Sequence, residues 1–310
     1  MMINKKIIFP IMVIIICIVG IVFTINYNKI TFESFKLTSL FSYFIISVFY
    51  LCIGAIRTPI ILDSKQYIKS FLIHRMSIVL GATTPIKLGL PIKIYLFKKY
   101  LGISTLKSTG AILYEIIISV FTIFILGIIF GSWVYIERLD SIALLIGILI
   151  LLGLFIFLIL INSSNNIVNL LRNKILIIIK VLRKVFNRFD IAVKIIMIQL
   201  IIQLIFILRI KLLLNGIGID SLPIIAISRA IIISSFITTI SAVPGGYGIK
   251  ELSIVFFLGL EGISKPDAII VSLADRTFQV LISLIIGIFA SFYFTNINRK
   301  EELNIVHASK

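Results

Sequence analysis

Long apolar runs recur from one end of the sequence to the other. Six of them have the roughly 20 residues that a helix needs to cross about 30 Å of hydrocarbon, at residues 7–25, 37–56, 108–130, 142–161, 193–214 and 268–295. Proline and glycine interrupt two further pairs of apolar segments, 68–84 with 92–100 and 222–243 with 252–260. The pattern predicts an all-α polytopic membrane protein with about six full transmembrane helices and two broken helical hairpins.

Composition supports a membrane location for the whole chain. Of the 310 residues, 60% are hydrophobic, and the mean hydropathy is +1.17. A soluble domain of this size would need more polar surface. No polar block is long enough for a separate soluble domain, so residues 1–310 are expected to form a single integral membrane domain.

The net charge of +17 lies in the gaps between the apolar runs. This distribution argues against nucleic-acid binding and favours contact with anionic phospholipid headgroups. The strongly basic gaps 57–107 and 172–194 are predicted to be cytoplasmic, and the mixed gap 131–141 external. Both termini are then cytoplasmic, and we expect a protein of the cytoplasmic membrane.

The remaining composition signals are weak. Lys5 and Lys6 before the first apolar run resemble a signal sequence, but no small-x-small cleavage site follows, which favours an uncleaved first helix. Cys17 and Cys52 lie inside apolar runs, as expected for packed or lipid-facing thiols. The sequence predicts neither a metal site nor a cofactor, since its two histidines are far apart.

The two interrupted segments resemble each other, which indicates an internal repeat. The matched positions are 159 or 160 residues apart: Pro85 with Pro244, Gly89 with Gly248, Gly102 with Gly262, and Glu115 with Asp275. The charge pattern puts the first glycine-containing loop inside and the second outside. We therefore predict an inverted-topology repeat with units 37–130 and 193–295 and a connector helix at 142–161. The simpler alternative is eight ordinary spanning helices.

The second interruption has the most distinctive sequence, Pro-Gly-Gly-Tyr-Gly-Ile-Lys-Glu from Pro244 to Glu251. Its glycines permit positive φ, and the N-terminus of the following helix could bind a phosphate. The candidate binding residues are Pro244, Gly245, Gly246, Gly248, Lys250 and Glu251. A tight turn in which Lys250 and Glu251 form a solvated cap is the alternative.

The first interruption supplies a counterpart with Pro85, Gly89 and Lys93. These residues are candidates for the same anion site. Alternatively, Lys93 faces cytoplasmic water or lipid phosphates.

Three charged residues, Glu115, Asp275 and Arg276, lie inside apolar helices, where an unpaired charge costs several kcal/mol. We expect Glu115 to pair with a basic group of the opposite repeat. The neighbours Asp275 and Arg276 point in different directions on a helix and should have different partners. The basic residues Arg209, Lys211 and Arg229 are expected to extend their side chains to the membrane interface.

These motifs resemble the flippase-like family of the transmembrane region of lysylphosphatidylglycerol synthases. The pattern Pro-Gly-Gly-x-Gly-x-basic-Glu from Pro244 to Glu251 carries the resemblance, with Gly262-Ile263-Ser264 and Arg276 after it. The first half has a similar signature, but Ile116 stands where the family has a basic residue.

The resemblance implies a protein of six to eight helices that translocates lipids or lipid-linked intermediates. No soluble aminoacyl-transferase domain follows the last helix in this sequence, so lysyl transfer is not implied, and we expect no enzyme. The alternatives are a membrane scaffold or accessory subunit for a glycosyltransferase or lipid synthase partner, and an enzyme acting on a lipid-linked substrate. The latter has no visible catalytic group.

Overall fold

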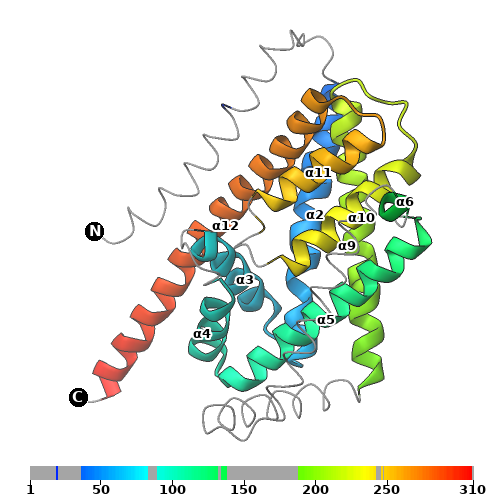
Figure 1. The fold of residues 1–310 in the computed structure, drawn as a ribbon. Coiled ribbons are helices and arrows are strands. Elements are labelled where there is room, and N and C mark those ends of the chain that lie inside the picture. Colours follow the sequence, from blue (N-terminus) through cyan, green and yellow to red (C-terminus); the bar gives the residue numbers. More distant parts are fainter. Residues whose placement is uncertain are drawn as a thin grey trace, which may run out of the picture.

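The computed structural model describes residues 36–82, 89–131, 134–137, 188–241, 246 and 248–308, together with Val19. All regular structure in these parts of the chain is helical (Figure 1). The helices are α2 (Leu37–Ile61), α3 (Tyr67–Ala82), α4 (Gly89–Leu101), α5 (Thr105–Ile129), α6 (Val134–Glu137), α9 (Phe189–Gly216), α10 (Ile224–Ile240), α11 (Ile249–Leu260) and α12 (Lys265–Ala308).

Four helices are long and apolar enough to cross a membrane: α2, α5, α9 and residues Lys265–Asn296 of α12. They match four of the six predicted spans. The other two, 7–25 and 142–161, lie outside the described residues. The α-helical polytopic membrane fold predicted from the sequence is therefore confirmed in the part of the chain that the structure describes.

Both predicted hairpins are present, as α3–α4 and α10–α11, and their second arms end in the same way. Gly102 follows α4 with φ +66° and Gly262 follows α11 with φ +93°. After each glycine, an isoleucine N–H bonds back to a carbonyl of the last helical turn, Ile103 to Phe97 and Ile263 to Leu258. A left-handed glycine of this kind ends a helix sharply.

The two halves pack on each other with a reciprocal pattern. α2 and α9, the first helices of the halves, lie side by side and run antiparallel, since the Lys36 N–H donates to the Gly216 carbonyl over 2.9 Å. The first hairpin arm α3 packs against α12 of the other half, and α10 packs correspondingly against α5. This is the arrangement that an inverted repeat would have. Its orientation in a membrane stays a prediction.

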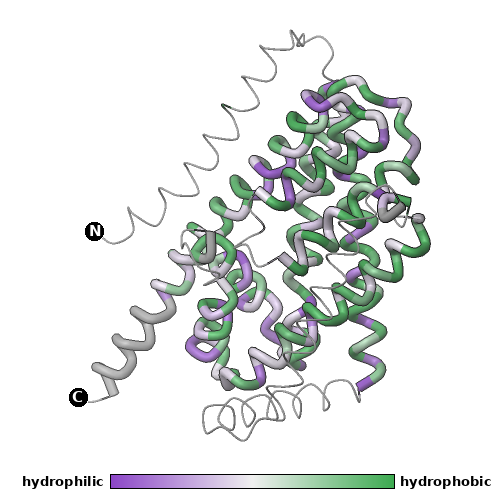
Figure 2. Tube along the Cα trace, viewed as in Figure 1, coloured by the Kyte–Doolittle hydropathy of each residue, from purple (hydrophilic) through white to green (hydrophobic). Residues whose placement is uncertain are grey.

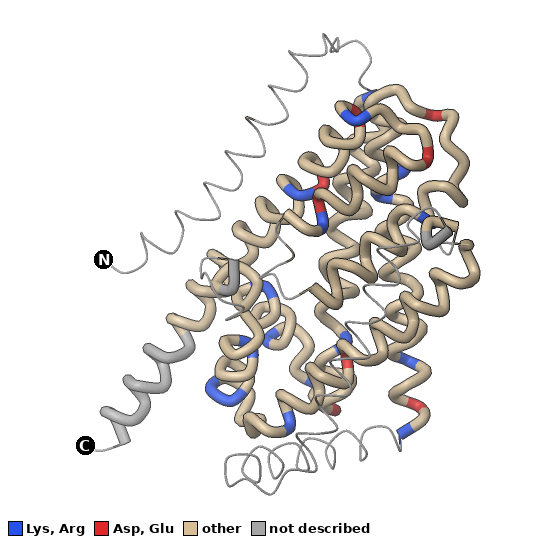
Figure 3. The backbone as a smooth tube through the Cα atoms, viewed as in Figure 1, with Lys and Arg blue, Asp and Glu red and all other residues tan. Residues whose placement is uncertain are grey.

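The outside of the bundle is largely apolar, and Figure 2 shows hydrophobic positions along most of the described helices. Large exposed side chains project from all four spanning helices, among them Phe49, Phe121, Met197, Phe289 and Phe292. In Figure 3, Lys and Arg gather at the end of the bundle formed by α3, α4 and the start of α9, while a separate group of charges lies within the bundle on α11 and α12. An apolar exterior with interior charges is typical of membrane proteins.

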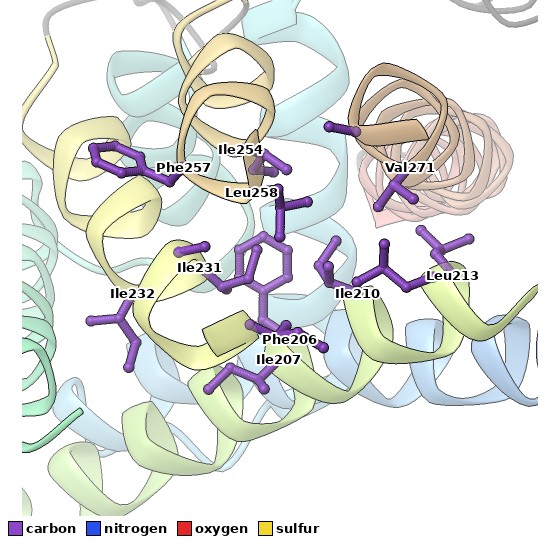
Figure 4. Close-up of a cluster of buried hydrophobic side chains, with 14 of the residues drawn as sticks. Phe206, Ile207, Ile210, Leu213, Ile231, Ile232, Ile254, Phe257, Leu258 and Val271 are labelled. Atoms are coloured by element: carbon purple, nitrogen blue, oxygen red, sulfur yellow. The ribbon is translucent and has the colours of Figure 1, made fainter. Parts of the chain in front are cut away.

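The main hydrophobic core lies between α9, α10, α11 and α12 (Figure 4). Phe206 and Ile210 of α9 pack in it with Ile231 of α10 and Leu258 of α11. α12 closes it with Val271. This packing fixes the helices that carry the second group of interior charges.

Candidate functional site

The first interior ion cluster surrounds Glu115 of α5. Its Oε1 lies 2.9 Å from Arg57 of α2, and its Oε2 lies 3.6 Å from the Nζ of Lys93 on α4. Thr58 completes the cluster, because its hydroxyl donates to Glu115 over 2.8 Å and accepts from Lys93 over 2.8 Å. A buried carboxylate persists when paired and hydrogen-bonded in this way.

This geometry corrects two expectations. Glu115 pairs with cations of its own half, not of the opposite repeat, because α2 and α4 flank α5 at this level. The Lys93 side chain is only 4% exposed. The alternative in which Lys93 faces cytoplasmic water is therefore wrong.

The second interior ion cluster surrounds Asp275 of α12, whose side chain is 1% exposed. One carboxylate oxygen accepts from Arg209 of α9 and from the Tyr43 hydroxyl at 3.1 Å. The other accepts from Lys250 of α11 at 3.0 Å and from Gln279 at 2.7 Å. Both acceptor sites of the carboxylate are thus used by two cations and two neutral donors.

The two clusters have the same composition in equivalent places. In each half, the last helix supplies the acid, the first helix supplies an arginine, and the second hairpin arm supplies a lysine. The halves therefore build matching charged centres within the bundle.

The expectation that Arg209 extends to the membrane interface is wrong. Its side chain is 0% exposed, because it pairs with Asp275 and its Nε donates to Ser47 over 2.9 Å. The ring of Tyr50 lies 4.7 Å from its guanidinium, a cation–π distance. Asp275 and α2 together hold this arginine inside.

The other two basic residues lie nearer the helix ends. Arg229 forms a two-pronged ion pair with Glu261 at 2.8 and 2.9 Å, so it is partnered by protein. Lys211 donates to the carbonyls of Asp220 and Leu222 in the loop after α9, each over 2.9 Å.

Around the glycine-rich interruption, Glu251 caps the start of α11. Its Oε2 accepts from the Gly248 N–H over 2.8 Å, and its Oε1 lies 3.1 Å from Arg276. Asp275 and Arg276 therefore have different partners, as predicted. Lys250 is not a solvated cap, since its side chain is 12% exposed and bonds Asp275.

The structure describes some of the glycine and proline residues that the sequence proposed as binding residues, but not all of them. Gly246 and Gly248 have φ of +66° and +80°, which accounts for glycine at both positions. Gly89 begins α4. Pro85, Pro244 and Gly245 lie outside the described residues.

A cavity of about 340 Å³ lies between the two halves. Arg57 and Glu115 line it from the first half, and Lys250 and Arg276 line it from the second. Its remaining lining includes polar side chains of four helices, namely Ser119, Gln199, Gln203, Ser235, Thr238, Thr239 and Gln279. The cavity thus connects the two ion clusters.

The charges at and behind the cavity wall do not cancel. The salt bridges join five cations (Arg57, Lys93, Arg209, Lys250 and Arg276) to three carboxylates (Glu115, Asp275 and Glu251). Two positive charges remain in excess among side chains that are at most 16% exposed, where electrostatic interactions are stronger than in bulk water. Such a site favours an anion.

Sequence reasoning missed several members of this site. The charge pattern puts Arg57 in a basic loop, yet the residue lies within α2 and donates to Ser119 and Gln199. Gln199 and Gln203 are four residues apart in an apolar helix, which was a usable signal, because that spacing puts both on one face. The same spacing relates Gln279 to Asp275 within α12, whereas the contribution of Tyr43 comes from tertiary packing.

One comparison with known proteins gives a match. A model of the family described as the lysylphosphatidylglycerol synthase TM region matches residues 7–287. No curated protein and no solved structure gives a significant match.

Proposed function

Since the chain belongs to the family of the lysylphosphatidylglycerol synthase TM region, we propose that it moves lipids or lipid-linked intermediates between membrane leaflets without catalysing a reaction. Membership indicates a membrane protein involved in lipid handling. The observation that supports translocation is the cavity between the halves, to which both contribute cations.

In this proposal the cavity binds the phosphate of an anionic headgroup. Arg57, Lys250 and Arg276 contact the cavity directly and offer donors for charge-assisted hydrogen bonds. Because the cations outnumber the carboxylates by two, a phosphate can bind to the cations without breaking every ion pair that the carboxylates form. The acyl chains stay in the bilayer beside the exposed apolar side chains of the spanning helices.

The reciprocal packing suggests how access could alternate. Each half contributes a hairpin arm to the last helix of the other, α3 on α12 and α10 on α5. A tilt of one half against the other would therefore shift both contacts together and open the cavity to one leaflet at a time. Many transporters built from inverted repeats move in this way.

The proposed orientation follows from the charges at the two ends. Among the residues whose side chains the structure describes, one end carries seven cations and two acids: Lys65, Lys69, Lys98, Lys99, Lys107, Arg188 and Lys194, with Asp63 and Asp190. The other carries Lys36, Lys211, Arg229 and Lys265 with Asp220, Glu261 and Asp267. By the positive-inside rule the first end is cytoplasmic. We propose the cytoplasmic membrane as the location, with both termini inside.

Reconstitution of the purified protein tests the function. Proteoliposomes containing lipids with a fluorescent acyl chain report leaflet transfer through the loss of fluorescence when an impermeant reductant is added. Transfer should require the wild-type protein and fall at least tenfold in Lys250→Met and Arg276→Met. The matched control Lys265→Met changes an exposed lysine outside the cavity and should transfer normally. Wild-type vesicles no faster than empty vesicles would refute the proposal.

A further inference from the structure

Two aromatic contacts join the halves at opposite ends of the bundle. At the end proposed as external, the ring centroid of Tyr135 on α6 lies 5.0 Å from that of Phe257 on α11. At the end proposed as cytoplasmic, Phe294 of α12 packs in one cluster with Phe97 of α4, and its ring stacks on Tyr100 at 4.1 Å. Each contact joins the segment that ends one half to the hairpin of the other half.

The predicted repeat relates these two contacts to each other. Phe257 follows Phe97 by 160 residues, and Phe294 follows Tyr135 by 159. These are the same two offsets that relate the matched proline, glycine and acidic residues of the interrupted segments. Aromatic side chains that match in sequence therefore also match in packing, as expected for equivalent contacts of an inverted repeat.

The cavity lies between the two aromatic contacts. On α12, Gln279 lines the cavity, and Phe294 follows it by 15 residues (294 − 279), which is about 22 Å along a helix. On α5, the last residue that lines the cavity is Ile123, and Tyr135 lies beyond the end of this helix at Ile129. The two contacts are thus on opposite sides of the cavity, towards the two charged ends of the bundle.

Close helix packing strengthens the contact at the cytoplasmic end. Between Gln279 and Phe294, α12 packs along α3 (Figure 1). A Cβ at Gly287 would lie 2.7 Å from the side chain of Val79, so the two helices meet there without room for another side chain. None of the described residues that line the cavity comes from α3. The seam between α3 and α12 therefore separates the cavity from this end.

The contact at the external end has a polar addition. The Tyr135 hydroxyl donates to Glu261, which also forms the two-pronged ion pair with Arg229. The Glu261 side chain is only 10% exposed, and a hydrogen bond to a charged group is stronger than one between neutral groups. At the matching position of the other contact, Phe294 offers no polar group.

We infer that the two aromatic contacts are the gates of the cavity. The Tyr135 contact closes the cavity towards the external end, and the Phe294 contact closes it towards the cytoplasmic end. Glu261 holds the external gate closed, because it binds α6 through Tyr135 and α10 through Arg229. Both gates are closed in this structure. The inference rests on the proposed function, in that it names the contacts that control access to the same cavity.

A cysteine in the cavity reports the state of the external gate. Thr239 lines the cavity, so Thr239→Cys, in a protein whose two native cysteines are changed to serine, should react slowly with an impermeant anionic thiol reagent while both gates are closed. Tyr135→Phe removes the hydroxyl and keeps the ring. Labelling from the external side should then rise about tenfold, as expected for the loss of a hydrogen bond to a charged group, and labelling from the cytoplasmic side, measured in inverted vesicles, should not change.

The matched control for this variant is Tyr95→Phe. It alters a tyrosine of α4 that is 59% exposed and should change neither labelling rate. Unchanged labelling in Tyr135→Phe, or an equal rise from both sides, would overturn the inference.

The variant Phe294→Leu tests the cytoplasmic gate in the same assay. It removes the ring that stacks on Tyr100 but keeps an apolar side chain, so labelling of Thr239→Cys from the cytoplasmic side should rise about threefold to tenfold, as expected for the loss of an aromatic pair. External labelling should not change. The matched control Phe292→Leu alters a phenylalanine of the same helix that is 67% exposed and should leave both rates unchanged. A rise from the external side in Phe294→Leu would contradict the assignment of the two gates.

The labelling assay separates a failure of this inference from a failure of the proposed function, because labelling requires no lipid to move. If no lipid is transferred in proteoliposomes but each variant increases labelling from its own side, translocation is refuted and the gates stand. If neither variant increases labelling from its own side, the gates are refuted whatever the transfer assay gives.

Discussion

Replacing Asp275 by asparagine should destabilise the bundle more than any other change of one carboxylate to its amide. The change keeps the size of the side chain but leaves Arg209, which is fully buried, and Lys250 without their anion. Asparagine also replaces one acceptor oxygen with an NH₂ group that faces cationic donors. Removing one partner of a buried pair costs about 3–5 kcal/mol, and two stranded cations argue for the upper part of that range.

The double variant Arg209→Met with Asp275→Asn tests this reasoning. It removes the stranded guanidinium, so its cost should be at least about 1 kcal/mol below the sum of the two single costs. Unfolding of the purified protein in mixed micelles with increasing denaturing detergent measures all three free energies. The matched control Asp63→Asn changes an 81% exposed aspartate whose positive φ asparagine also adopts, and should cost less than about 0.5 kcal/mol. Additive costs, or an Asp275→Asn cost within that limit, would show that the charges are not coupled as the structure indicates.

Three further predictions address packing, backbone and orientation. A Cβ at Gly287 would lie 2.7 Å from Val79, so Gly287→Ala should destabilise by about 1–3 kcal/mol in the same unfolding assay, and adding Val79→Ala should recover part of the loss. At Gly248, φ is +80° and ψ is −50°, outside the left-handed helical region that asparagine tolerates, with open space around the Cβ position, so Gly248→Ala and Gly248→Asn should each cost about 1–3 kcal/mol through backbone strain; a cost below about 0.5 kcal/mol for either would contradict the strain. In a protein with its two native cysteines changed to serine, Lys265→Cys should react with an impermeant thiol reagent in intact cells, whereas Lys107→Cys should react only after permeabilisation; labelling of both without it would rule out the proposed orientation.

The sequence was sufficient to predict the described helices, but it did not predict which charged residues form ion pairs. Runs of about 20 apolar residues predicted α2, α5, α9 and α12 because hydrocarbon thickness alone sets that length. Proline and glycine predicted both interrupted hairpins because their backbone restrictions are local. The partner of Glu115 depends on which helices flank α5, which is a tertiary property, and the expectation failed there.

Arg209 shows why the position of a residue in the sequence is not enough to predict where its side chain lies. Its place in α9 suggested a side chain that extends to the interface, as lysine and arginine do when only lipid surrounds them. The reciprocal packing instead brings Asp275, Ser47 and Tyr50 around it. The predicted repeat does not align the two lysines, because Lys250 follows Lys93 by 157 residues whereas Asp275 follows Glu115 by 160. Their equivalence is visible only in three dimensions.

The energetics of the two ion clusters indicate that their charged residues serve a function beyond stability. Well-packed apolar side chains often stabilise an interior as well as a buried ion pair does, or better. This chain is 60% hydrophobic and builds its main core from isoleucine, leucine and phenylalanine. Yet each half retains an acid with two cations, and the cavity lies between these centres. Because stability alone gives no reason for matched charges in both halves, we infer that an anionic ligand which both halves contact is the reason.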